Sequence, residues 1–367
     1  MHFSRNFSTR IIYITAKSIG HSAVISLLLF IMTDAAMSQQ FVNIPDSSLR
    51  AGIEKELGKN PGEPITTAEM ETFTELRLNQ MEIENLSGLE SAKNLRSESF
   101  DGNSISDIST LADLTKLTWL YVEHNLISDI SALAHLTKLT HLSLWGNSVS
   151  DISVLSGLTK LTCLNLKDNS ISDVSALAGL TRLTTLLISE NSISDISALA
   201  GLTNMTWLAL WENAISDISP LSNLANLSSI SLDVNNISDK SALSNLTNLT
   251  HVSLAVNSIT DISVLSGLTK LIWLALYGNS ISEISALSDL IHLTHLYLGG
   301  NTISNISGLS GLTSLESLNL NGNLISDITE LAGFTGLTGL NLSNNSISDV
   351  SASVSYTHLT LPTKRIV

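Results

Sequence analysis

Apolar and polar residues recur along the chain with a period of 22 residues, and an asparagine marks each period. Around each asparagine the chain reads approximately L-x-x-L-x-L-x-x-N-x-I-S-D-I-S-x-L-x-x-L-T. One phase held through twelve copies indicates a repeat array. A unit of 22 residues holds a short strand, a turn and a brief 3-10 segment, but not a full helix with its loops. The marker asparagines are Asn103, Asn125, Asn147, Asn169, Asn191, Asn213, Asn235, Asn257, Asn279, Asn301, Asn323 and Asn345.

Side-chain direction follows from the spacing within one unit. Leu120 and Val122 are two residues apart, so both leave the predicted strand on the same side and point inward. The residues that alternate with them then point to solvent. Asn125 follows the strand, where the chain must turn inside the core. Its side-chain amide can both donate hydrogen bonds to and accept them from backbone groups that the turn would otherwise leave unpaired. The pattern therefore predicts stacked strands that form one parallel sheet over an apolar interior.

The motif L-x-x-L-x-L-x-x-N, with its I-S-D-I-S-x-L return, resembles the 22-residue leucine-rich repeat of bacterial internalin-like proteins. The resemblance covers about residues 41 to 351. It implies a leucine-rich-repeat solenoid of the α/β repeat class, with a curved parallel β-sheet on the concave side. It also implies 3-10 or irregular segments on the convex side, a helical N-terminal cap, and a partner bound at the concave strand positions. About 13 turns of 22 residues would occupy residues 76–350.

Residues 39–75 are out of repeat phase and are expected to form the helical N-terminal cap. Asp46 can cap a helix that carries Leu49, Ile53 and Leu57, and Thr66 or Thr67 can cap a second short helix. Such a cap would cover the open edge of the first strand. Glu98 takes an inward leucine position in the next turn. Because a buried unpaired carboxylate is costly, we expect either a partner from the cap or a distorted turn.

The two ends of the chain differ from the repeats. Residues 1–38 combine a basic start with an apolar run at 23–32, which is typical of a signal peptide, although a retained anchor is the alternative. That run is shorter than the roughly 20 residues of a membrane-spanning helix, so no stable span is expected in the mature chain. Residues 351–367 lose the repeat pattern and are interpreted as an aberrant tail that is not native. We expect a bacterial protein that is secreted or held at the cell surface.

Composition narrows the classes of function. The net charge of −15 argues against nucleic acid as a partner. The single cysteine, Cys163, excludes an internal disulfide. Cys163 and His141 lie one strand apart in register, which leaves a Cys–His pair as a remote catalytic alternative. Histidines in alternate repeats are about 10 Å apart, too far to share one ion. We therefore expect no enzyme activity, no cofactor and no metal site.

Aromatic residues gather at the solvent-facing strand positions, which lie six, four and two residues before each asparagine. All five tryptophans of the chain stand there. Three patches result. The first is Trp119, Tyr121, Glu123, His141 and Trp145, the middle one is Leu187, Trp207 and Trp211, and the third is a ladder of His251, Trp273 and His295 flanked by Tyr277 and Tyr297. Binding is favoured over simple cross-strand stacking because tryptophan and tyrosine dominate interface energies. The candidate ligand-binding residues are Trp119, Tyr121, Glu123, His141, Trp145, Trp207, Trp211, His251, Trp273, Tyr277, His295 and Tyr297.

The predicted ligand is a protein, because the face is long and shallow. A glycan stacked on the rings is the second choice, and a purely structural cell-surface spacer is the competing class. Sugar hydroxyls need carboxylates and amides beside the rings. The side chains that could supply them are Glu123, Asp168, Glu190, Glu212, Asn165 and Asp233.

A column of acidic residues stands four positions after the asparagines. Its even repetition favours a structural role, in which each carboxylate caps its own return turn. A calcium-binding ladder is the alternative. The column comprises Asp107, Asp129, Asp151, Asp173, Asp195, Asp217, Asp239, Asp261, Glu283, Asp327 and Asp349, with Asn305 as its one interruption.

Overall fold

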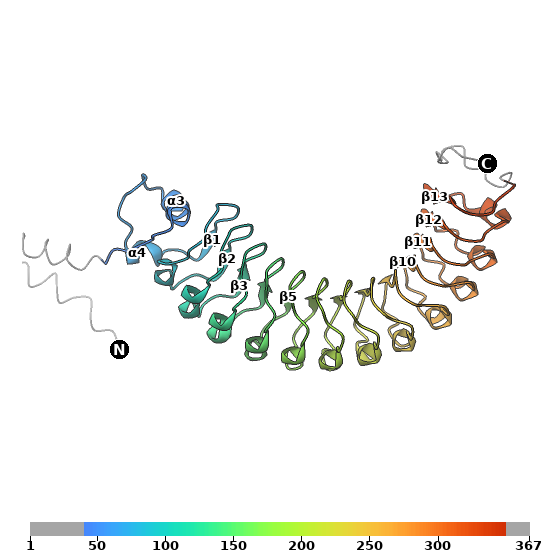
Figure 1. Ribbon diagram of the computed structural model, residues 1–367, viewed down its shortest axis with the longest axis horizontal. Helices are drawn as coiled ribbons and strands as arrows, with labels where there is room; N and C mark the ends of the chain where they lie inside the picture. Colours follow the sequence, from blue (N-terminus) through green and yellow to red (C-terminus); the bar gives the residue numbers. More distant parts are fainter. Residues whose placement is uncertain (1–39, 350–367) are drawn as a thin grey trace, which may run out of the picture.

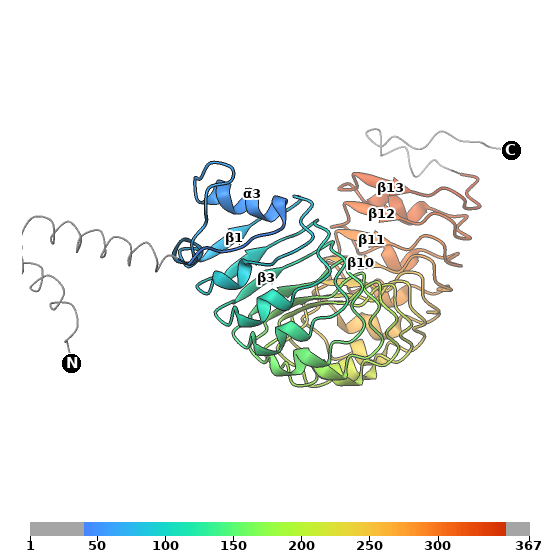
Figure 2. The same cartoon turned by 60° about the vertical axis from the view of Figure 1, so that its left-hand side comes forward.

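The computed structural model describes residues 40–349, so the predicted signal peptide at 1–38 and the predicted tail at 351–367 lie outside the described residues. Within that range, thirteen parallel strands form one sheet in sequence order. The sheet is curved, with strands on its inner side and 3-10 segments on its outer side (Figure 1). Figure 2 shows the strands of the first and last repeats, around β1 to β3 and β10 to β13, stacked one upon the next. The predicted leucine-rich-repeat solenoid is confirmed.

Each strand is three residues long, and each return contains a short 3-10 segment. The strands are β1 (Glu75–Arg77), β2 (Ser97–Ser99), β3 (Trp119–Tyr121), β4 (His141–Ser143), β5 (Cys163–Asn165), β6 (Thr185–Leu187), β7 (Trp207–Ala209), β8 (Ser229–Ser231), β9 (His251–Ser253), β10 (Trp273–Ala275), β11 (His295–Tyr297), β12 (Ser317–Asn319) and β13 (Gly339–Asn341). The 3-10 segments are η1 (Leu89–Ser91), η2 (Ser109–Asp113), η3 (Ser131–His135), η4 (Ser153–Gly157), η5 (Ser175–Leu177), η6 (Ser197–Leu199), η7 (Ser219–Asn223), η8 (Ser241–Leu243), η9 (Ser263–Gly267), η10 (Ser285–Leu287), η11 (Ser307–Leu309) and η12 (Thr329–Gly333).

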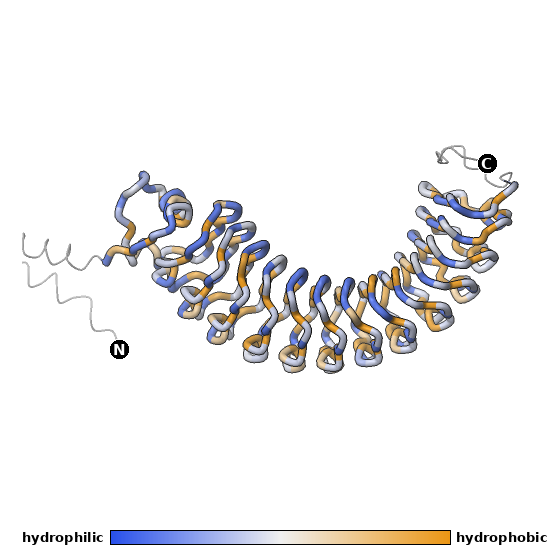
Figure 3. The backbone as a smooth tube through the Cα atoms, in the orientation of Figure 1, coloured by the Kyte–Doolittle hydropathy of each residue, from blue (hydrophilic) through white to orange (hydrophobic). Residues whose placement is uncertain are grey.

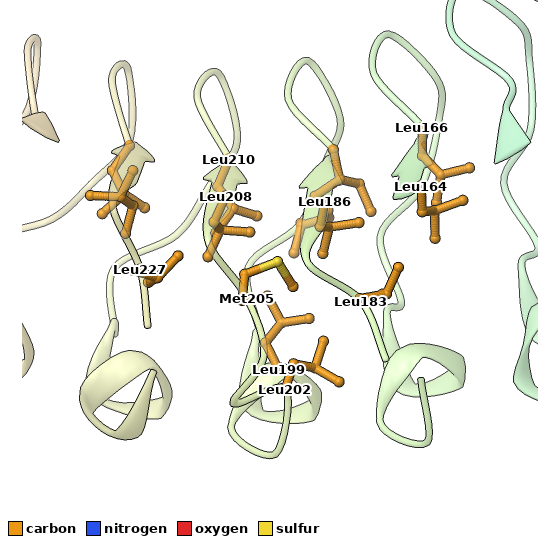
Figure 4. Close-up of a cluster of buried hydrophobic side chains, with 14 of the residues drawn as sticks. Leu164, Leu166, Leu183, Leu186, Leu199, Leu202, Met205, Leu208, Leu210 and Leu227 are labelled. Atoms are coloured by element: carbon orange, nitrogen blue, oxygen red, sulfur yellow. The ribbon is translucent and has the colours of Figure 1, made fainter. Parts of the chain in front are cut away.

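The core is a continuous stack of leucine and isoleucine columns between the sheet and the returns. Leu164, Leu186 and Leu208 face one another on β5, β6 and β7 and are fully buried. Met205 fills a leucine position in the same stack (Figure 4). Burying each such side chain is worth roughly 1.5–3 kcal/mol. Because every unit shares its apolar side chains with both neighbours, stability accumulates along the stack rather than in one centre.

The marker asparagines join each repeat to the one before it. Asn235 donates from Nδ2 to the carbonyls of Leu210 and Leu232, at 3.0 and 3.1 Å. Its Oδ1 accepts the amide N–H of Ile215 at 2.9 Å. The same pattern repeats from Asn103 to Asn345. These hydrogen bonds satisfy backbone groups that the tight turn would otherwise leave unpaired in the core, as the sequence predicts.

Left-handed backbone occurs at the residue before each marker asparagine, which we call the corner. Figure 3 shows hydrophilic residues gathered in the loops that follow the strands in the central repeats. Glycine adopts this conformation without strain, and several corners carry it. Five successive central corners do not, and their φ angles are 54° at Asp168, 54° at Glu190, 58° at Glu212, 53° at Val234 and 51° at Val256. For branched valine this conformation is an outlier.

Two helices precede the first repeats. Helix α3 (Ser47–Glu56) begins at Asp46, whose Oδ1 accepts the amides of Ser48 and Leu49. The other carboxylate oxygen accepts the amides of Glu84 and Asn85, so one side chain ties the helix to the first repeat. Helix α4 (Thr67–Met70) begins at Thr66 with a reciprocal capping box, which satisfies two amides that the helix leaves free. No helix within residues 40–349 is long and apolar enough to cross a membrane.

The acidic column caps the returns, as predicted. Asp129 Oδ1 accepts the amide of Ser131 at 2.8 Å, and this backbone hydrogen bond holds the pKa of Asp129 below its usual value. The same bond recurs through most of the column. Among residues 40–349, no three His, Cys, Asp or Glu side chains lie close enough together to hold a metal ion. The calcium ladder therefore has no geometric support in this part of the chain.

Glu98 is where the sequence expectation was wrong. Strand β2 pairs in register with both neighbours, with Glu98 between Leu76 and Leu120, so the turn is not distorted. The carboxyl is fully buried, and neither oxygen finds a hydrogen-bond partner among residues 40–349. Burial raises the pKa of Glu98 to about 8. The side chain therefore keeps its proton at neutral pH, which avoids a buried charge without any partner from the cap.

Candidate functional site

The predicted ligand-binding residues lie on the outward side of the sheet, which is the concave side of the curve in Figure 1. All five tryptophans stand outside the core: Trp119 is 43% and Trp207 49% exposed, and the other three are half-buried. The inward residues between them, such as Leu120 and Leu208, are fully buried. The alternation read from the sequence is therefore correct at every indole.

The first patch is a set of packed rings on β3 and β4. The Trp119 ring stacks on His141 at 4.0 Å between centroids and 19° between planes. Tyr121 meets the edge of the same indole at 6.1 Å. Glu123 accepts the Ser143 hydroxyl at 2.6 Å. These contacts hold the rings in fixed orientations.

His124, which the sequence analysis overlooked, extends the first patch at its corner. Its ring packs against Trp145 at 4.4 Å. It stands at a left-handed corner with φ 50°, a backbone conformation that glycine adopts without strain. That departure from glycine is the signal that marks it in the sequence.

Lys167 is the second residue that sequence reasoning missed, and it changes the grouping of the patches. Its ammonium lies 4.7 Å from the Trp145 ring centroid and 4.9 Å from that of Trp211. It also lies 3.0 Å from Glu190 Oε1. Trp211 thus joins Trp145 through Lys167, whereas Trp207 makes no ring contact within residues 40–349. Leu187, predicted beside these two tryptophans, is half-buried on β6.

The third patch lies on β9 to β11. Trp273 is paired in register with His251 on one side and His295 on the other. Tyr297 contacts both the Trp273 ring at 5.6 Å and the His295 ring at 6.5 Å. Tyr277 is 44% exposed at the corner end of the same repeats. His251, Trp273 and His295 thus stand in one column, and the ring contacts of this patch both involve Tyr297 and are tilted rather than stacked flat.

Three histidines of the concave face each contact the hydroxyl of the preceding threonine. His141 Nδ1 lies 2.9 Å from Thr140 Oγ1, and that oxygen also lies 3.0 Å from the Thr118 carbonyl. The same arrangement recurs at His251 with Thr250 and at His295 with Thr294. Burial lowers the pKa of His141.

Most carboxylates beside the rings are already engaged. Glu123 is held by Ser143, and Glu190 by Lys167. Asp233 accepts the Ser253 hydroxyl and the Ala255 amide. Carboxylates in internal bonds are poorly placed to bind sugar hydroxyls, so glycan binding finds no support in this geometry.

Cys163 faces His141 across β5 and β4 without the properties of a nucleophile. The thiol is half-buried, and burial raises its pKa. The protonated thiol is a weak nucleophile. The His141 ring is engaged with Trp119 and Thr140 instead. The geometry gives the Cys–His alternative no support.

Comparisons with known proteins agree with this architecture. The family model described as Leucine Rich repeats (2 copies) matches residues 137–179 and 291–333. An internalin (InlF) from Listeria monocytogenes is 39% identical, with a TM-score of 0.86 over 89% of this chain and 98% of that one. The chain belongs to the internalin family. Internalin C2 from the same species is 32% identical, with a TM-score of 0.53 over 65% of this chain and 98% of that one.

More distant leucine-rich-repeat structures share only the fold with this internalin. The plant peptide hormone receptor RGFR1 in complex with RGF2 is 23% identical, with a TM-score of 0.57 over 70% of this chain and 52% of that one. No match was found among curated protein sequences.

Proposed function

We propose that this chain is a non-catalytic protein-binding module, exported to the bacterial surface or secreted, whose concave aromatic patches recognise a protein partner. The observation that carries the proposal is the position of the indoles. All five stand on one face of the sheet, partly exposed, while the inward columns are aliphatic apart from a few positions. Exposed tryptophan is unfavourable for solubility unless a partner covers it.

The arrangement of the rings also supports recognition. Trp119 is held by His141, and Trp145 by His124, so little conformational entropy is lost when a partner binds. Large, rigid aromatic side chains of this kind supply most of the binding energy at protein interfaces. The receptor complex noted above has a bound ligand on the same fold, which is consistent with a protein or peptide partner.

The competing class is a structural spacer, in which the concave face binds nothing specific. Replacing Trp119, Trp145, Trp211 and Trp273 by serine separates the two. The full chain and this variant are immobilised and compared for capture of biotinylated surface proteins from cultured cells. We expect the variant to lose capture, because each buried anchor is worth about 2 kcal/mol or more. Equal capture by both proteins would leave the spacer as the better description.

A matched control removes exposed apolar surface elsewhere. Leu126, Ile291 and Leu324 are 61%, 52% and 58% exposed and lie outside the outward strand positions. Their combined replacement by serine should leave capture unchanged. Circular dichroism melts of all three proteins verify that the repeats remain folded. Loss of capture in the control variant would show that nonspecific adsorption to exposed apolar surface, rather than the aromatic face, retains proteins.

A further inference from the structure

The ammonium group of Lys167 occupies a cage between two indole rings. Trp145 and Trp211 lie on either side of it at 4.7 and 4.9 Å, and Glu190 completes the cage at 3.0 Å. The Lys167 side chain is only 26% exposed. Two aromatic faces and a carboxylate around one centre form an arrangement that binds cations of many kinds. The cage is therefore built for a positive charge, whichever residue supplies it.

The charges around the cage exceed what Lys167 can neutralise. Asp168, Glu190 and Glu212 stand at three successive corners beside it. Lys167 forms its ion pair with Glu190 alone. Asp168 and Glu212 are exposed and make no ion pair within residues 40–349. The surroundings thus remain favourable for a second cation from outside.

A buried hydroxyl lies in the same column as the cage. Ser189 stands two residues before its asparagine, between Lys167 and Trp211 in repeat order, so the Lys167 side chain must pass over it to reach Trp211. Ser189 is 1% exposed, and its Oγ has no hydrogen-bond partner within residues 40–349. Leaving such a group unsatisfied costs about 1–3 kcal/mol. Lys167 covers this hydroxyl but does not satisfy it.

We propose that the cage between Trp145 and Trp211 is a binding site for an arginine side chain of the protein partner, and that Lys167 occupies it in the unbound chain. A guanidinium group is planar and stacks on aromatic faces. Its five N–H donors suit a site that offers both the Glu190 carboxylate and the Ser189 hydroxyl. The long, flexible side chain of Lys167 then swings out to solvent near Asp168. The partner as source of the arginine rests on the proposed function, but the chemistry of the cage does not.

The alternative is that Lys167 is a permanent support that holds the two indoles apart. A small probe distinguishes the two readings. N-acetyl-arginine methylamide is titrated into the full chain and into Lys167→Ala, with indole fluorescence and indole N–H resonances as readouts. We expect Lys167→Ala to bind the probe at least about tenfold more tightly than the unmodified chain, because the competing ammonium is gone. The uncharged analogue N-acetyl-citrulline methylamide should bind neither protein.

Three results would overturn the proposal: equal affinity of both proteins for the arginine probe, no saturable binding to Lys167→Ala, or equal binding of the citrulline analogue. Adding Trp211→Ser to Lys167→Ala should abolish binding. Lys116→Ala is the matched control, because Lys116 is an exposed lysine whose ammonium donates to Asn94, away from the indole rings. It should behave like the unmodified chain, and melting curves of every variant verify folding.

The capture experiment separates this inference from the proposed function. If the tryptophan-to-serine variant loses protein capture while Lys167→Ala binds no arginine probe, the face binds proteins but the cage is only a support. If Lys167→Ala binds the probe while no protein is captured, the cage is confirmed as a cation site and the protein-binding role fails. Lys167→Ala should capture the partner at least as well as the unmodified chain.

Discussion

The two halves of the concave face share one backbone and differ in their charges. The first half comprises the outward and corner positions from Glu75 to Val234, and the second half those from His251 to Asn344. The second half has no Asp, Glu, Lys or Arg at these positions. The first half has two basic residues there, Arg77 and Lys167, and its acidic residues are Glu75, Asp101, Glu123, Asp168, Glu190, Glu212 and Asp233.

The interior makes no such distinction. Asn235 in the first half and Asn301 in the second make the same set of hydrogen bonds at nearly the same lengths. Apart from a few positions, the inward columns are buried aliphatic residues in both. The repeat therefore constrains what lies inside and leaves the outward columns free to vary. A partner that spans the face would meet a charged aromatic surface first and an uncharged one, rich in histidine and tyrosine, second.

Glu98 is the largest departure of the first half from a uniform interior. Its pKa is raised from 4.5 to about 8 by burial, so the folded chain holds a proton that the unfolded chain releases. The stability that this proton confers is complete below about pH 4.5 and is lost as pH rises toward 8. We expect unfolding free energy to fall by about 4 kcal/mol between about pH 5 and pH 8 relative to Glu98→Gln. Urea melts across that range test it, with the exposed Glu84→Gln as control.

The hydrogen bonds of the marker asparagines should contribute equally to the unfolding free energy in both halves. Asn235→Ala leaves the Ile215 amide without its hydrogen-bond acceptor, and Asn301→Ala does the same to the Ile281 amide. Each substitution also removes the donor to buried carbonyls. We expect each substitution to lower the unfolding free energy by about 3 kcal/mol. Denaturant titration of the two variants is the measurement. A difference of more than about 1 kcal/mol between them would mean that the interiors of the halves are not equivalent.

The corners should show a smaller effect, which depends on the corner residue rather than on the half in which it lies. Val234 and Val256 have left-handed backbone, whereas Gly278 holds the equivalent corner of the next repeat with φ 66°. Replacing either valine by glycine should stabilise the chain by about 1 kcal/mol, because the strain of the branched side chain exceeds the added freedom of the unfolded chain. Gly278→Val should destabilise it. Melting temperatures of the three variants give the answer, and a loss on valine removal would contradict the strain.

The smallest expected effect concerns salt. Raising NaCl from about 50 to about 300 mM should slow association with the captured partner by about threefold through the charges of the first half. Asp168→Asn with Glu212→Gln should weaken this dependence. Ser317→Ala, in the uncharged half, should leave it intact. Association rates measured by surface plasmon resonance would contradict the comparison if all three proteins responded alike.

Much of this architecture could be predicted from the sequence, because the period of 22 determines which side chains point inward. The direction of the five indoles and the asparagine bonds follow from position within the repeat. The caps at Asp46 and Thr66, which lie outside the repeats, follow from the residue types that favour a helix start. Lys167 could not be found in this way, since its contact with Trp211 passes across an intervening strand and depends on side-chain rotamers. For a related reason, the sequence did not show that the Glu98 carboxyl has no hydrogen-bond partner among residues 40–349. Sequence spacing shows that a residue is inward but not whether a partner reaches it.

The hydrogen bonds that each asparagine amide makes to the preceding repeat also affect the order in which the solenoid assembles. Each amide bonds a carbonyl 25 residues earlier and an N–H 20 residues earlier, as Asn213 does with Ile188 and Ile193. A newly synthesised turn is therefore left incomplete until the next one emerges from the ribosome. Assembly of the coil must lag synthesis by one full turn, with each turn finished by its successor.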